Sequence, residues 1–247
     1  MTASAFESGR RCWPYVSREA NVFYFRINKV KIIDNETTKG FLGLGRDLAT
    51  VQLWSLIVSG NMDLPNLDEL LKTTDPQRKK ELVMDIVKAV AATRRLTPIE
   101  SVKDNQTAFF GDTGYVLYQS KEIPEDFSWQ FTAIKLNDRT RDVGAEILGV
   151  VNHQEFGSFA NSLPALIGGT MNPGYTAAVE VGKFIFSIVG DVLSKKRDQQ
   201  IGLLYMSLDR VEHYPHGVRN SQDVVDLTGN MYVDYAIFGY DDRKAHR

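Results

Sequence analysis

The sequence predicts a mainly β protein, an antiparallel β-sandwich with two helical insertions near residues 76–95 and 176–196. Short segments that alternate apolar and polar residues recur along the chain, without the strand–helix–strand rhythm of a parallel sheet. Two longer segments repeat apolar residues every three or four positions, which is the spacing of an amphipathic helix. No Pro/Ser-rich linker or repeat interrupts residues 21–247, so we expect a single domain preceded by an N-terminal arm at residues 1–20.

The first half of the chain predicts strands on either side of a turn-rich loop, followed by a helix. Residues 22–33 alternate, but their apolar side chains change from one face to the other near Asn28, which indicates a bulge or twist. Residues 51–60 are apolar on both faces, as in a buried strand. Asp75 is a candidate N-cap for the helix, and Pro76 suits its first turn.

The second half predicts further strands around an apolar insert. The expected strands are 114–120, 127–136, 146–151, 201–214 and 230–240. Residues 156–179 carry no charge, but prolines and glycines interrupt them, so no continuous membrane-spanning helix fits. We expect the helix near 176–196 to lie against the sandwich; the alternatives are a membrane-docking helix and a helix that binds a partner.

Composition restricts the class of protein. The chain has 29 basic and 31 acidic residues and a formal charge of -2, without long runs of either sign, which gives no electrostatic case for nucleic acid. Its single cysteine, Cys12, excludes an internal disulfide framework. Residues 1–20 lack the apolar segment of a secretory signal, and no transmembrane helix is evident, so we expect a cytoplasmic protein.

Motifs of catalysis and cofactor binding are missing from the sequence. It contains no P-loop, HExxH, CxxC or GxSxG motif. We therefore expect no cofactor and a non-enzymatic interaction or assembly protein, with protein partners or self-assembly. A hydrolase that uses loop carboxylates is a further alternative.

Carboxylates gather in the loops that follow two predicted strands. Asp34, Glu36 and Asp47 lie in the loop after the first strand, and Asp138 and Asp142 follow residues 127–136. Calcium takes six to eight oxygen ligands, mostly from such flexible loops. If the two loops converge, these five side chains form a candidate calcium site.

The segments FRINKVKIIDNETT and IPEDFSWQFTAIKLNDRTRD each run from a strand into an acidic loop. This layout resembles a C2-like β-sandwich, the fold of many peripheral membrane and scaffolding modules. The resemblance implies a calcium-binding module that contacts a membrane surface. However, calcium-binding C2 domains carry a denser pair of aspartates in the later loop, whereas here Arg139 and Arg141 lie among the carboxylates. We therefore expect a version that has lost calcium and serves assembly.

The last predicted strand brings aromatic side chains to one face. Tyr232, Phe238 and Tyr240 share this face, opposite the apolar side chains of Met231 and Val233. Aromatic residues are enriched in protein interfaces, but the core of a sandwich is also aromatic. The sequence alone leaves both assignments open.

Overall fold

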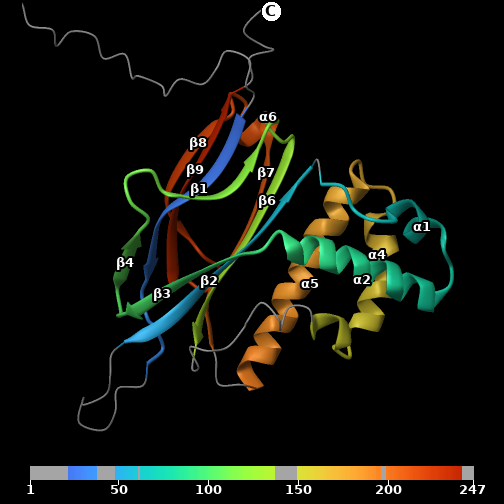
Figure 1. Ribbon diagram of the computed structural model, residues 1–247, viewed down its shortest axis with the longest axis horizontal. Helices are drawn as coiled ribbons and strands as arrows, with labels where there is room; N and C mark the ends of the chain where they lie inside the picture. The colour runs from blue at the N-terminus through green and yellow to red at the C-terminus, as the bar shows by residue number, and fades with distance from the viewer. Residues whose placement is uncertain (1–21, 38–47, 61, 137–148, 196–198, 241–247) are drawn as a thin grey trace, which may run out of the picture.

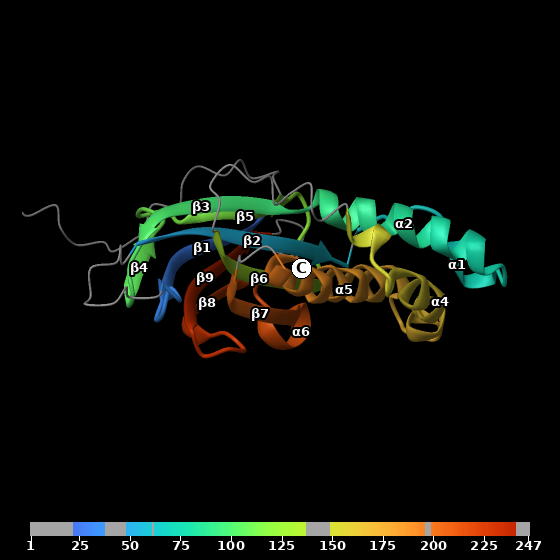
Figure 2. The ribbon, with the colours of Figure 1, turned by 90° about the horizontal axis from the view of Figure 1, so that it is seen from below.

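The computed structural model describes residues 22–37, 48–60, 62–136, 149–195 and 199–240. Two antiparallel sheets pack face to face, and a layer of helices covers the outer side of one of them (Figures 1 and 2). The predicted β-sandwich with helical insertions is confirmed.

The first sheet, here sheet A, has one face in the core of the sandwich and one face outside. Its strands are β1 (Val22–Ile32), β4 (Gln106–Phe109), β5 (Tyr115–Ser120), β8 (Val218–Val225) and β9 (Met231–Tyr240). The order is β4-β1-β9-β8, and β5 pairs with the first half of β1. Phe23, Phe25 and Ile27 of β1 are buried, and after an irregularity between Ile27 and Lys29 the buried positions become Val30 and Ile32. The predicted change of face near Asn28 is confirmed.

The second sheet, sheet B, is covered on both faces. Its order is β3-β2-β6-β7, with β3 at Arg95–Val102, β2 at Ala49–Ser59, β6 at Asp126–Leu136 and β7 at Gln199–Asp209. Nearly every residue of β2 and β6 is buried, because one face meets sheet A and the other meets the helices. Strands covered on both sides are expected to be apolar without alternation.

The helical layer is built from α1 (Leu67–Lys72), α2 (Pro76–Ala92), α4 (Phe156–Ile167) and α5 (Pro173–Lys195). A short helix, α6 (Arg210–His213), follows β7. The Asp75 side chain accepts a hydrogen bond from the Gln77 amide, as expected of an N-cap. Figure 1 shows α5 running alongside β2 and β6, so the predicted packing of this helix on the sandwich is confirmed.

Two sequence predictions need correction. Residues 146–151 were expected to form a strand, but their described part belongs to a 3-10 turn, η1 (Gly149–Asn152). Val150 is buried among the helices and Val151 packs beside it, so the apolar residues that suggested a strand serve the helical core. Residues 95–102, assigned in part to the end of a helix, form strand β3 instead, and the helix ends at Ala92.

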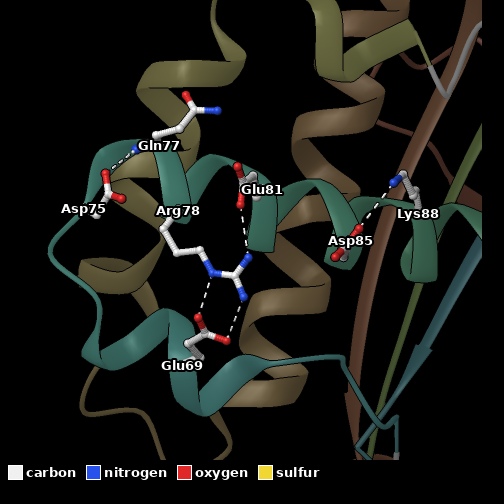
Figure 3. A network of polar contacts seen from close by, with 7 residues as sticks. All are labelled: Glu69, Asp75, Gln77, Arg78, Glu81, Asp85 and Lys88. Carbon is white, nitrogen blue, oxygen red and sulfur yellow. Dashed lines mark hydrogen bonds and ion pairs between the residues drawn. The ribbon is translucent and has the colours of Figure 1, made fainter.

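A polar network fastens α1 to α2 (Figure 3). The Arg78 guanidinium donates to both carboxylate oxygens of Glu69, at 2.7 and 3.0 Å, and to Glu81 on its own helix at 3.0 Å. Hydrogen bonding to these carboxylates, Glu69 first, raises the pKa of Arg78. The bidentate geometry links the two helices at the surface.

Two buried clusters meet at sheet B. Between the sheets, the rings of Phe25 and Trp129 pack edge to face with their centroids 4.9 Å apart. On the helical side, Trp54 of β2 meets Phe186 of α5 in the same way at 5.6 Å. Sheet B therefore joins the sandwich core to the helical core.

Candidate functional site

The predicted calcium loops leave the sandwich at the same end. Thr50, near the start of β2, is paired with Leu136 at the end of β6, so the strand ends to which these two loops are attached are adjacent. Asp34 and Glu36 belong to the described residues. Asp47, Asp138 and Asp142 lie outside them, and convergence of all five carboxylates stays a prediction.

Asp34 and Glu36 take part in a tight turn. The Asp34 carboxylate accepts the Glu36 amide at 2.7 Å, and Glu36 has a φ of 55°. The ammonium group of Lys135 donates to the Glu36 carbonyl oxygen and, at 3.1 Å, to the Gln199 side chain. A positive charge therefore already lies at this turn, beside the predicted carboxylate ligands. Within the described ranges, no group of three or more His, Cys, Asp or Glu side chains is placed to hold a metal.

The residue between these carboxylates has a structural role. Asn35 is fully buried, and its side-chain amide donates to the Val102 carbonyl at 2.8 Å. Its backbone amide donates to Asp104 at 3.0 Å, so the turn is tied to the connection between β3 and β4. The start of the first acidic loop is thus held by hydrogen bonds from several segments.

Asp226, in the turn between β8 and β9, closes the free edge of β7. Its buried carboxylate accepts the Leu203 amide at 2.7 Å and the Met231 amide at 2.9 Å. The Leu227 amide donates to the Leu203 carbonyl at 2.8 Å, and the Asn230 side chain donates to the Ile201 carbonyl at 2.7 Å. Backbone groups at the edge of sheet B are therefore paired with a turn of sheet A.

The other long edge strands are irregular. β8 shifts register between Ser221 and Val224, and Asp223 has a φ of 51°. β3 contains Pro98, and Ser101 has a φ of 58°. Bulges and prolines are the means by which natural sheets prevent edge-to-edge pairing. The edges of β3 and β8 are therefore poorly suited to pairing with a further strand.

One sheet face has no cover among the described helices. The helices that contact the sheets extensively do so on sheet B, and Figure 2 shows the helical layer beside β2 and β6, away from β8 and β9. We call the opposite side the outer face of sheet A. It includes Tyr24, Arg26, Lys29, Lys31, Val116, Val218, Val225, Tyr232, Asp234, Ala236 and Phe238.

Apolar side chains form a row across one end of this face. Tyr24 and Phe238 are cross-strand partners whose rings stack with centroids 6.5 Å apart. Val218 lies opposite Phe238 on β8, and Val116 lies opposite Arg26 on β5. Val116 is 44% exposed and Val218 45%. Exposed apolar residues that gather on one face are typical of a protein contact surface.

An ion-pair group occupies the middle of the outer face. The Lys29 ammonium lies 2.9 Å from Asp223 and 3.0 Å from Asp234. Hydrogen bonding to Asp223 and Asp234 raises the pKa of Lys29. Lys31 and Tyr232, a cross-strand pair, lie on the other side of this group from the apolar row. The face thus combines an apolar zone at one end with a charged group in the middle.

The sequence indicated part of this surface. Tyr232, Phe238 and Tyr240 were expected on one face of the last strand, and Met231, Val233, Tyr235 and Ile237 are indeed buried on the other. The sequence did not predict that Val116 of β5 and Val218 of β8 lie on this face. Their position depends on which strands pair with one another, and no local pattern shows that. The alternation in residues 22–33 did contain a signal, since it sets Tyr24 and Arg26 opposite the core residues.

A cluster of hydroxyl groups at the end of sheet B shows no activated nucleophile. The Tyr175 hydroxyl lies 3.0 Å from the Ser207 hydroxyl, where α5 meets β7. Burial raises the pKa of Tyr175, so its hydroxyl keeps its proton at neutral pH. The Tyr214 hydroxyl donates to the Pro124 carbonyl at 2.8 Å, and burial raises its pKa as well. These groups join segments of the fold.

No protein-family model matches the chain, and no curated protein matches it. None of the helices in the described ranges has the length and apolar character needed to cross a membrane.

Proposed function

We propose that this protein is a non-enzymatic interaction module that binds another protein surface, including that of a second copy, through the outer face of sheet A. The observation that supports this proposal is the contrast between the two sheets. Sheet B is covered on both sides, whereas sheet A leaves one side free of described helices and places exposed valines and a stacked aromatic pair there.

Three of the edge strands add support. The edge of β7 is closed by Asp226 and Asn230, while β3 and β8 are interrupted by Pro98 and by a bulge. Strand addition needs a regular, open edge. A flat face that combines apolar rows with an ion-pair group can instead accept a complementary surface without changing the fold.

Light scattering after size-exclusion chromatography, over a series of protein concentrations, tests the proposal in its self-association form. We expect the wild-type chain to associate, and we expect a Val116→Arg, Val218→Arg double variant to stay monomeric. Both side chains are nearly half exposed, so arginine is tolerated in the fold.

The matched control places the same charge on the helical layer. Leu166 is 51% exposed and Met171 is fully exposed, so a Leu166→Arg, Met171→Arg variant should associate like the wild type. The proposal is wrong if the control variant loses association while the sheet variant keeps it. If the wild type is monomeric, chemical crosslinking to partner proteins from the native host, compared between the two variants, becomes the deciding measurement.

A peripheral membrane module of C2 type is the second candidate. It is favoured by the adjacency of Thr50 and Leu136, which brings the bases of the two acidic loops together. Calcium-dependent co-sedimentation with anionic liposomes, lost in an Asp34→Asn, Asp138→Asn variant, would support it. Calorimetry that detects no calcium binding would remove the calcium-dependent form.

A further inference from the structure

The outer face of sheet A begins where the chain enters the described structure. Val22, the first residue of β1, pairs with Tyr240, the last residue of β9. The next outward pair along the same two strands is Tyr24 with Phe238, which belongs to the apolar row. The N-terminal arm at residues 1–20, which lies outside the described ranges, is therefore attached beside the apolar row.

The arm carries large apolar side chains close to this attachment. Trp13, Tyr15 and Val16 surround Pro14, within nine residues of Val22. An extended chain advances about 3.3 Å per residue, so Trp13 can lie up to about 30 Å from the start of β1. The arm is thus long enough to turn back and lie over the apolar row. Proline lacks the backbone N–H that a further strand would need, so this segment suits a sheet face better than a sheet edge.

The order of residues in the arm matches the order of zones on the face. Ser17 and Asn21 enclose a segment that suits a reversal of the chain, because both residue types are common in turns. An extended segment before such a turn runs back along β1 with the same rise per residue as the strand beneath it. Tyr15 and Trp13 then come over the apolar row, and Arg11 comes over the ion-pair group.

The charges agree with this order. In the ion-pair group the carboxylates of Asp223 and Asp234 meet a single ammonium group, that of Lys29, and the Asp223 side chain is 67% exposed. Arg26, between the apolar row and this group, donates instead to a carbonyl oxygen of the turn between β4 and β5. The group can therefore accept a second positive charge, and Arg11 supplies one.

We propose that residues 10–17 of the N-terminal arm bind the outer face of sheet A within the same molecule and compete there with a protein partner. The inference rests on the proposed function, since it concerns the same face. Attachment at Val22 keeps the arm at a high effective concentration, so it covers the face when no partner is bound. A partner must displace the arm, which lowers its apparent affinity.

Tryptophan fluorescence of the full chain tests the contact. Trp54 and Trp129 are fully buried, so acrylamide, which quenches by collision, reports mainly on Trp13. We expect Trp13 of the wild type to be quenched several-fold less than Trp13 of the Val116→Arg, Val218→Arg variant. Equal and strong quenching of the two proteins overturns the proposal.

Control variants isolate this signal. Trp13→Phe in each background leaves only the two buried tryptophans, whose weak quenching shows that the variant is folded. Leu166→Arg, Met171→Arg adds the same charge to the helical layer and should leave Trp13 protected. The protection should persist at concentrations at which light scattering gives a monomer. Its loss on dilution contradicts binding within one molecule.

A change in the arm separates this inference from the proposed function. A full chain with Trp13→Ala and Tyr15→Ala should associate at a several-fold lower concentration than the wild type, because less competes for the face. Unchanged association of this variant contradicts competition by the arm. If neither protein associates while Trp13 of the wild type is protected, the arm contact stands and self-association through this face is wrong.

Discussion

Strands β1 and β2 have the same length but very different surroundings. β1 alternates buried and partly exposed residues, because only one face of sheet A meets the core. β2 is buried almost throughout, because sheet B meets the sandwich on one side and α5 and α2 on the other. Sheet B therefore contributes buried residues to both cores, whereas one side of sheet A can accept substitutions at little cost in stability. A contact surface can develop where substitution costs little.

The sharpest test of this contrast replaces one outward residue in each sheet. Leu56 of β2 faces the helices and is fully buried, so Leu56→Ala should lower the free energy of unfolding by about 2–5 kcal/mol. Val116 of β5 faces outward and is 44% exposed. Val116→Ala should therefore change the free energy of unfolding by no more than about 0.5 kcal/mol. Urea unfolding of the two variants gives the comparison. Similar losses would mean that the outer face of sheet A is covered in solution.

The connection between the sheets should be nearly as sensitive. Asp226→Asn puts an amide group among backbone N–H donors, including that of Leu203, so part of their pairing is lost. We expect a loss of about 1–3 kcal/mol in unfolding free energy. Asp223→Asn is the control, since the Asp223 side chain is 67% exposed and pairs only at the surface. Hydrogen exchange should show faster opening at Leu203 in the first variant alone.

Two glycines of the helical layer should respond with opposite signs. Gly182→Ala brings a Cβ atom to 2.5 Å from the Gln130 side chain, and we expect a loss of about 1–3 kcal/mol from overpacking. Gly157 of α4 has nothing within 4 Å of the same position, so Gly157→Ala should stabilise the helix by up to about 1 kcal/mol. Thermal unfolding distinguishes them. A stable Gly182→Ala variant would show that α5 moves freely on sheet B.

The smallest effect is expected from the ion-pair group of the outer face. Lys29 is partly exposed, so Lys29→Met should cost about 0.2–1 kcal/mol near neutral pH. The pKa of Lys29 is raised above its ordinary value of 10.5. Its contribution to the stability of the fold is therefore complete below about pH 10.5 and is lost as the pH rises further. The difference in stability between wild type and variant should therefore shrink in strongly alkaline solution. A constant difference would assign the cost to packing.

Local patterns in the sequence predicted the regular elements well. The N-cap at Asp75, the change of face near Asn28 and the buried strand at residues 51–60 depend on neighbouring residues, and all are confirmed. The helix was predicted to extend to residue 95 and strand β3 was missed, because β3 is an edge strand with Pro98 and polar residues, which weakens its alternation. The pairing order of the strands depends on contacts between distant segments, so no local pattern reveals it.

The candidate site shows the same limit. The alternation of residues along the last strand predicted its aromatic face. Its neighbours Val116 and Val218 come from segments about a hundred residues apart, so their place on the same face could not be predicted. The carboxylates of the loops were predicted to form a site because of their residue type and their place after predicted strands. In the structure, Asp34 holds a turn, and the buried Asp226, which the sequence did not single out, binds four donor groups.

The pairing of β1 with β9 has a consequence for synthesis. Val22 is matched with Tyr240, and Ile32 with Met231, so the first described strand finds a central partner only at the end of the chain. During translation the edge of β1 that pairs with β9 stays open until β9 has left the ribosome. Pairing over such a distance in sequence makes folding slow and exposes the nascent chain to aggregation. A chain terminated before residue 231 lacks this partner altogether, which makes such products natural targets of chaperones and proteases.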